Sequence, residues 1–224
     1  MNDRNGAGTL NYQSKQTFDT MEQNVQNWSH TTNNIYNAVL LFSIGTIVAG
    51  LLAGLTVAFA MLGSGAVLFR ILTWIAQIAV AVWYVLYMIG LGNLRCSVNE
   101  KESAALGQVR TAAILTIVTA ILGLFSIPGW INGIINFIAF VMMLVGFNTL
   151  KKSETMPLKA RTGFNQLFIA MLLNIIATGL VVIFSWIPLV GSVMSVIAGI
   201  LGIIGFIMVI TGWAAVKHAP APLA

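Results

Sequence analysis

The sequence predicts an all-α transmembrane protein of six helices, arranged as three tandem transmembrane hairpins and preceded by an amphipathic helix. Three observations lead to this prediction: long stretches without charge, a one-sided placement of basic residues, and a recurring pattern at helix ends. Residues 111–150 and 162–216 contain no Asp, Glu, Lys or Arg. A helix rises about 1.5 Å per residue, so roughly 20 apolar residues cross a hydrocarbon core of about 30 Å. Each stretch is therefore long enough for two crossings.

The composition excludes a soluble fold. The chain is 58% hydrophobic and 8% charged, with a mean hydropathy of +0.90, whereas about a quarter of residues are charged in soluble domains. The net charge of +5 does not indicate nucleic-acid binding, because the basic residues lie between apolar segments, where they record membrane orientation. Cys96 is the only cysteine, which leaves no intramolecular disulfide.

Six apolar segments are expected to cross the membrane as helices, because a backbone in lipid must satisfy its hydrogen bonds within the segment. Turns are expected at Gly63-Ser64-Gly65, at Pro128-Gly129 and at Pro188. The crossings cover about residues 35–61, 67–94, 104–127, 130–150, 162–186 and 189–216. The three hairpins then occupy residues 35–95, 104–151 and 162–217, and residues 218–224 form a short tail.

Residues 1–34 form a polar arm without the basic and apolar regions of a signal peptide. Within this arm, apolar residues recur at helical spacing: they are Phe18, Met21, Val25, Trp28 and Ile35. We expect a short amphipathic helix in the headgroup region, with Trp28 and Tyr36 at interfacial depth. A helix that docks on a protein partner is the alternative.

The basic residues predict the orientation. Ten of the eleven Lys and Arg residues lie in the arm, in the second-to-third and fourth-to-fifth loops, and in the tail, while only Arg70 lies on the opposite side. Because positive charge accumulates on the cytoplasmic side, both termini are expected in the cytoplasm of a bacterial inner (cytoplasmic) membrane.

A six-residue pattern recurs at the ends of the even-numbered helices, over residues 90–95, 146–151 and 212–217. It reads glycine, large apolar residue, two variable residues, branched apolar residue and basic residue. Such self-similarity indicates an internal repeat of one hairpin. The glycine would allow close helix approach, and Arg95, Lys151 and Lys217 would anchor the helix ends in the headgroups on the cytoplasmic side.

These Gly-rich hairpins, with residues 146–153 and the following Lys159-Ala160-Arg161-Thr162-Gly163-Phe164-Asn165, resemble a group of proteins. The group comprises uncharacterised tandem-hairpin multi-pass membrane proteins of bacteria and archaea, and the resemblance covers about residues 107–217. It implies the fold but carries over no activity and no site residues.

The predicted crossings lack the residues that catalysis or coupled transport requires. No Asp or Glu lies in a crossing, and His30 and His218 lie in the polar ends. Arg70 lies near a helix start, where its side chain can snorkel. Ion-coupled transport and intramembrane hydrolysis are therefore disfavoured, and we expect no catalytic residue, no metal and no cofactor.

Uncharged polar residues and small residues remain as candidate sites. The candidate intramembrane polar contacts are Gln77, Asn132, Asn136 and Asn174. They indicate either interhelical hydrogen bonds or, at Asn136 and Asn174, a polar path. The residues that suit close helix packing, within one chain or between copies, are Gly45, Ala49, Gly50, Gly54, Gly129, Gly133, Gly199, Gly202 and Gly205.

The pattern as a whole favours a non-enzymatic scaffold or accessory subunit. Its expected partners are the lipid bilayer and either further copies, in a homo-oligomer, or other membrane subunits. A passive channel or facilitator for a small neutral or apolar solute is the alternative, and a sensor that uses the arm as its output is a third hypothesis.

Overall fold

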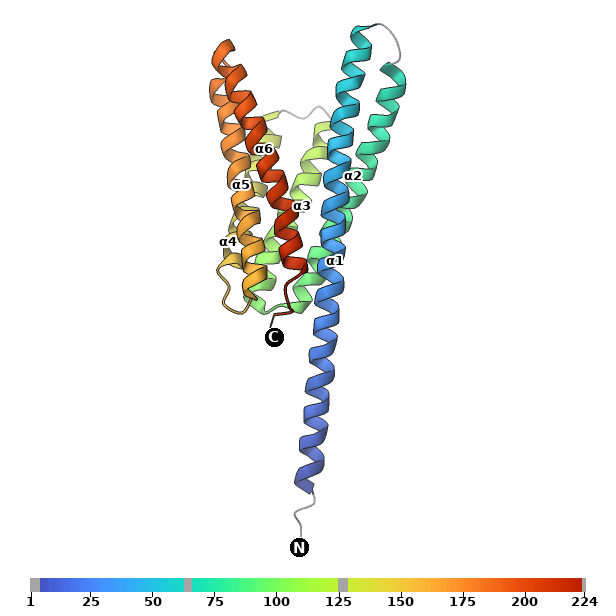
Figure 1. Cartoon of the computed structure of the whole chain (residues 1–224), viewed down its shortest axis with the longest axis vertical. Helices are drawn as coiled ribbons and strands as arrows, with labels where there is room; N and C mark the ends of the chain where they lie inside the picture. The colour runs from blue at the N-terminus through green and yellow to red at the C-terminus, as the bar shows by residue number, and fades with distance from the viewer. Residues whose placement is uncertain (1–4, 63–65, 125–128, 223–224) are drawn as a thin grey trace.

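The chain folds into six long helices. A computed structural model describes the backbone of residues 5–62, 66–124 and 129–222, and the side chains of these residues except 5–21, 123, 124 and 188. The elements are α1 (Asn5–Met61), α2 (Ala66–Leu94), the 3₁₀ helix η1 (Arg95–Ser97), α3 (Glu100–Leu124), α4 (Gly129–Lys151), α5 (Leu158–Phe184) and α6 (Pro188–Lys217) (Figure 1). Each of the six α-helices contains a segment long and apolar enough to cross a membrane. The expected all-helical fold, with six helices long and apolar enough to cross a membrane, is confirmed.

Of the three predicted turns, Gly63-Ser64-Gly65 and Pro128 lie outside the described residues. Pro188 is the first residue of α6. Proline is well suited to this position, since the first backbone N–H groups of a helix have no partner within the helix.

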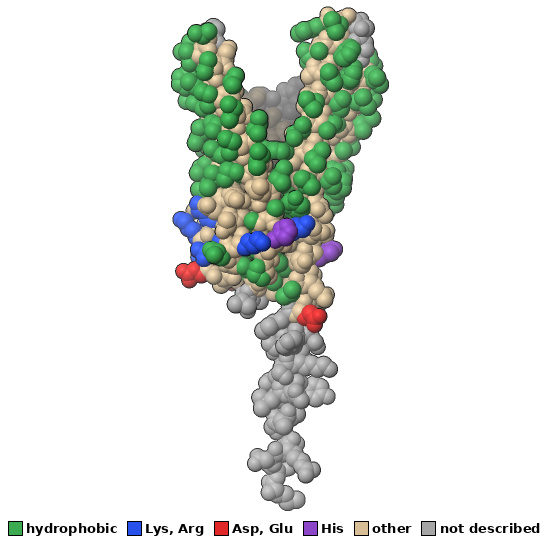
Figure 2. All heavy atoms as spheres, viewed as in Figure 1, with side chains coloured by type: hydrophobic (Ala, Val, Ile, Leu, Met, Phe, Trp, Pro, Cys, Tyr) green, Lys and Arg blue, Asp and Glu red, His purple; other side chains and the backbone are tan. Residues whose placement is uncertain are grey.

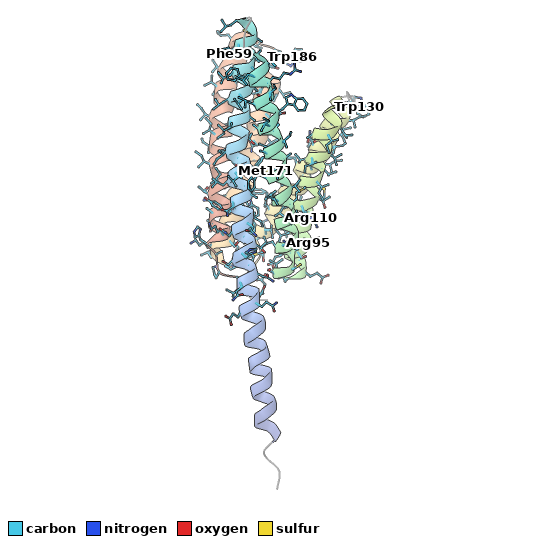
Figure 3. All side chains as sticks on the ribbon, turned by 90° about the vertical axis from the view of Figure 1, so that its right-hand side faces the viewer. Phe59, Arg95, Arg110, Trp130, Met171 and Trp186 are labelled. Atoms are coloured by element: carbon cyan, nitrogen blue, oxygen red, sulfur yellow. The ribbon has the colours of Figure 1, made fainter. Side chains whose placement is uncertain are left out.

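The helices pack in consecutive pairs that diverge toward one end. The most extensive contacts join α1 to α2, α3 to α4, and α5 to α6, and smaller contacts link α2 to α3, α4 to α5, and α6 to α1. The pairs meet near the basic end of the bundle and separate toward the other (Figures 1 and 2). Figure 3 shows α4, with Trp130 near its tip, leaning away from the pair that carries Phe59. The bundle is therefore closed at the basic end only.

The hydrophobic core lies where the pairs converge. Phe164 is 6.4 Å from Phe147 and 6.1 Å from Trp213, measured between ring centroids, and Trp213 is 5.7 Å from Tyr87. These rings join helices from all three pairs. Toward the divergent end the apolar side chains become exposed, as a surface facing lipid requires (Figure 2).

The arm differs from the expected short helix, because α1 runs unbroken from Asn5 to Met61. No Gly or Pro occurs between residues 9 and 44 to end the helix. Trp28 is buried by protein: it is 1% exposed and donates its indole N–H to the Ala219 carbonyl at 3.0 Å. The interfacial depth of Trp28 and Tyr36 stays a prediction. Ile35 is buried, whereas Val25 is 53% exposed. The side chains of Phe18 and Met21 lie outside the described set.

Candidate functional site

Three glycines near the ends of α2, α4 and α6 allow the helix pairs to close. A Cβ built on Gly90 would lie 2.5 Å from Cγ1 of Ile35 on α1, and one on Gly146 would lie 2.9 Å from a carbonyl oxygen of α3. A Cβ on Gly212 would lie 2.9 Å from the carbonyl oxygen of Gly163 on α5. Such distances are too short for a side chain, so the close approach predicted for this position of the pattern is observed.

The apolar positions of the same six-residue pattern form the core. None is more than 3% exposed: they are Leu91, Leu94, Phe147, Leu150, Trp213 and Val216. Each pattern thus places one glycine against the paired helix and two side chains in the shared core. These stretches serve packing at the basic end.

The basic residue that ends each pattern is half-buried and contacts its own chain. Arg95 donates from Nε to the Ser103 carbonyl at 3.0 Å. The Lys151 ammonium lies 3.4 Å from the ring centroid of Phe168, and the Lys217 ammonium lies 4.6 Å from that of Tyr36. Arg95, Lys151 and Lys217 therefore cover the edge of the core, and their anchoring to headgroups stays a prediction.

Two arginines each lie against a glycine of the neighbouring element, which the sequence analysis did not anticipate. Arg95 lies against Gly107 of α3, and Arg110 lies against Gly92 of α2. A Cβ built on Gly107 would lie 3.3 Å from Cζ of Arg95, and one on Gly92 would lie 3.2 Å from Cζ of Arg110. The Nε of Arg110 is buried and has no hydrogen-bond partner within the described chain. The signal was present as two Gly-x-x-Arg sequences, residues 92–95 and 107–110.

The four candidate intramembrane polar residues do not come together in one site. Asn136 accepts a hydrogen bond at 2.9 Å from Thr119, which joins α4 to α3. Asn174 lies beside Gly205 of α6, since a Cβ built there would lie 3.6 Å from its Nδ2. Asn132 is half-buried, and its Oδ1 has no hydrogen-bond partner among the described residues. Gln77 is exposed on α2.

The candidate packing glycines fall into two groups. Gly45 and Gly205 lie against neighbouring helices, with their built Cβ atoms 2.8 Å from Val80 and 3.4 Å from the Ala170 carbonyl oxygen. Ala49 is half-buried. For the others, no described atom of another residue outside the local helix backbone lies within 4 Å of a built Cβ: they are Gly50, Gly54, Gly129, Gly133, Gly199 and Gly202.

We call these six residues the open glycines. They form one pair each on α1, α4 and α6, and Gly50/Gly54 and Gly129/Gly133 have the Gly-x-x-x-Gly spacing. Residues at this spacing share one face of a helix and let a second helix approach closely. Each pair lies on a different diverging helix pair (Figure 1). The described chain supplies no packing partner for these faces, which makes them the candidate functional surface.

A buried carboxylate at the basic end was missed by the sequence analysis. Glu102 is 1% exposed and accepts hydrogen bonds from the hydroxyls of Ser153 and Thr155 and from the backbone N–H of Asn99. The Asn99 side chain in turn accepts from the Glu102 N–H at 3.1 Å. This reciprocal pair is a capping box, which Asn-x-x-Glu before an apolar run could have indicated. Through Ser153 and Thr155, the Glu102 carboxylate links the start of α3 to the loop between α4 and α5.

No set of three or more His, Cys, Asp or Glu residues is placed to hold a metal in the part of the chain that the structure describes. Comparison of the chain with protein-family models, curated proteins and solved structures found no match. The resemblance to tandem-hairpin membrane proteins therefore stays a prediction.

Proposed function

We propose that this chain is a non-enzymatic membrane scaffold or accessory subunit that packs, through its open glycines, into a homo-oligomer or a larger membrane complex. The observation that carries the proposal is the pair of open glycines on each of α1, α4 and α6. Lipid is as apolar as leucine, so helices associate in membranes mainly where small residues permit close contact. Six such residues without a described neighbour favour a helix from outside the chain.

The shape of the bundle supports the same function. The helix pairs are held together at the basic end and diverge toward the other end (Figures 1 and 2). By residue number, the open glycines lie in the parts of α1, α4 and α6 that are farther from the basic end. Three helix pairs that are joined at one end and separated at the other suit a protein that presents helices to partners. In this proposal the chain consists of three tandem hairpins, each of which is one copy of an internal repeat.

The proposed location is the bacterial inner membrane, with the basic end and both termini in the cytoplasm. The support is the excess of Lys and Arg at one end of the helices. A reporter fused after Ala224 and another inserted at Ser64 should report opposite sides of the membrane. Reports from the same side would refute the hairpin topology.

The mass of the full chain in mild detergent tests the association. We expect the wild type to migrate as a multiple of 24.1 kDa or together with a fixed partner. Replacing Gly50 and Gly54 by Leu should release the single chain, because the larger side chains block close approach. Ala60→Leu adds a Leu to the same helix outside that face and should leave the assembly unchanged. A wild-type protein that is monomeric and co-purifies with nothing would refute the proposal.

A further inference from the structure

A groove that contains one lysine and two histidines lies at the basic end of the bundle. This groove of about 650 Å³ lies between α1 and the end of α6 and is lined by Ser29, His30, Asn33, Lys217 and His218, among others. His30 and His218 are the only histidines in the chain. They come from opposite ends of the sequence and line the same groove.

The position of the tail is fixed by contacts with α1. Trp28 donates its buried indole N–H to the Ala219 carbonyl, one residue beyond His218. The His218 ring nitrogen Nδ1 lies 2.7 Å from the Ala214 carbonyl oxygen and donates to it, so the N–H of this ring is used within its own helix. The Lys217 ammonium lies over the ring of Tyr36 and forms no ion pair within the described residues. The groove thus holds an ammonium group without a described counter-ion, beside two imidazoles.

The groove also lies at the end of a helix long and apolar enough to cross a membrane. Lys217 ends the candidate membrane-spanning segment Leu189–Lys217, and Figure 2 shows extensive hydrophobic surface between the His and Lys side chains and the divergent end. Basic pockets beside membrane-spanning helices are suited to phosphate-bearing headgroups. The nearest acidic residue along α1 is Glu22, one helical turn before the lining residue Gln26. Glu22 does not line the groove, so no carboxylate lies among the lining residues beside Lys217.

We propose that this groove binds the phosphate group of an anionic phospholipid from the leaflet at the basic end. Lys217 supplies the charge, while His30 and Ser29 supply hydrogen-bond donors. A phospholipid is favoured over soluble phosphate because, with its phosphate in the groove, its acyl chains can lie against the exposed apolar side chains toward the divergent end. The inference does not depend on self-association.

Native mass spectrometry of the full chain in detergent, titrated with phosphatidylglycerol, tests the proposal. We expect one lipid retained per chain, in preference to zwitterionic phosphatidylcholine. Lys217→Gln should weaken retention about tenfold, as expected for loss of one hydrogen bond to a charged group. The matched control is Lys152→Gln, an exposed lysine at the same end outside the groove, which should retain the lipid.

Two further variants separate binding from folding. Lys217→Arg should restore retention, and His30→Ala should reduce it while leaving Lys217 on Tyr36. Equal losses in Lys217→Gln and Lys152→Gln, equal retention of both lipids, or full displacement by millimolar inorganic phosphate would overturn the proposal. So would a Lys217→Gln protein whose oligomer mass falls while its bound lipid is unchanged, since a second copy would then occupy the groove.

Discussion

Gly163 of α5 and Gly212 of α6 face each other so closely that each backbone occupies the space a partner side chain would need. A Cβ on Gly212 would lie 2.9 Å from the Gly163 carbonyl oxygen and 3.0 Å from Cγ of Leu167. This contact closes the α5/α6 pair beside the core residue Trp213. The corresponding glycines Gly90 and Gly146 also meet their paired helices closely.

Gly212→Ala is expected to destabilise the protein by about 1–3 kcal/mol, because the added methyl group forces the two backbones apart. Thermal unfolding in detergent measures the change. Gly179→Ala is the matched control on α5, the other helix of the same pair. No described atom of another residue outside its local helix backbone lies within 4 Å of a Cβ built there, so this variant should be at least as stable as the wild type. Equal destabilisation of both variants would show that close backbone contact between α5 and α6 is not the reason that position 212 requires glycine.

Trp28→Phe should lower the free energy of unfolding by about 1 kcal/mol, because the Ala219 carbonyl loses its buried donor. The tail should also become more susceptible to carboxypeptidase. Trp130, 69% exposed near the start of α4, provides the control, and Trp130→Phe should leave the tail protected. An unchanged tail in Trp28→Phe would mean that the indole does not hold it.

Glu102→Gln should destabilise the protein by about 2 kcal/mol, since its amide NH₂ replaces one carboxylate oxygen that accepts hydrogen bonds in a buried site. Glu100→Gln changes the same charge at an exposed position of the same helical turn, and its stability should stay within about 0.5 kcal/mol of wild type. Chemical denaturation of the two variants measures the difference. The site would prove unimportant if both variants unfolded alike.

Thr119 and Asn136 should be coupled by about 0.6 kcal/mol, the average for hydrogen bonds between membrane helices. A double-mutant cycle with Thr119→Val and Asn136→Leu measures this energy. If Asn136 instead lined a path for solutes, Asn136→Leu would reduce flux into reconstituted vesicles. We expect the flux to be unaffected, and a clear loss would favour the channel hypothesis.

The general fold was accessible from the sequence because it follows from length, hydropathy and charge. The role of Gly90, Gly146 and Gly212 was also predictable, since the close approach of two helices requires glycine. Other features depend on which helix faces which. Trp28 has the spacing of an amphipathic stripe, yet it is buried because the tail returns to cover it.

Contacts between distant segments were not predictable from local patterns. Glu102 is buried only because Ser153 and Thr155 are brought to it from the next loop. Gly45 and Gly50 look alike in sequence, but only Gly45 meets a neighbouring helix, at Val80. Gly45 and Gly50 lie about 140° apart around α1, so the face that α1 turns toward α2 decides between them, and a single sequence does not specify that face.

Cysteine cross-linking in native membranes tests the central claim most directly, namely that the open glycines pack against a helix outside the chain. In a Cys96→Ser background, Val57→Cys places an exposed thiol on the same face of α1 as Gly50 and Gly54, and Leu55→Cys places one on another face. On oxidation, Val57→Cys should give a covalent product larger than one chain, while Leu55→Cys stays monomeric. Equal products from both positions, or none from Val57→Cys, would contradict the account.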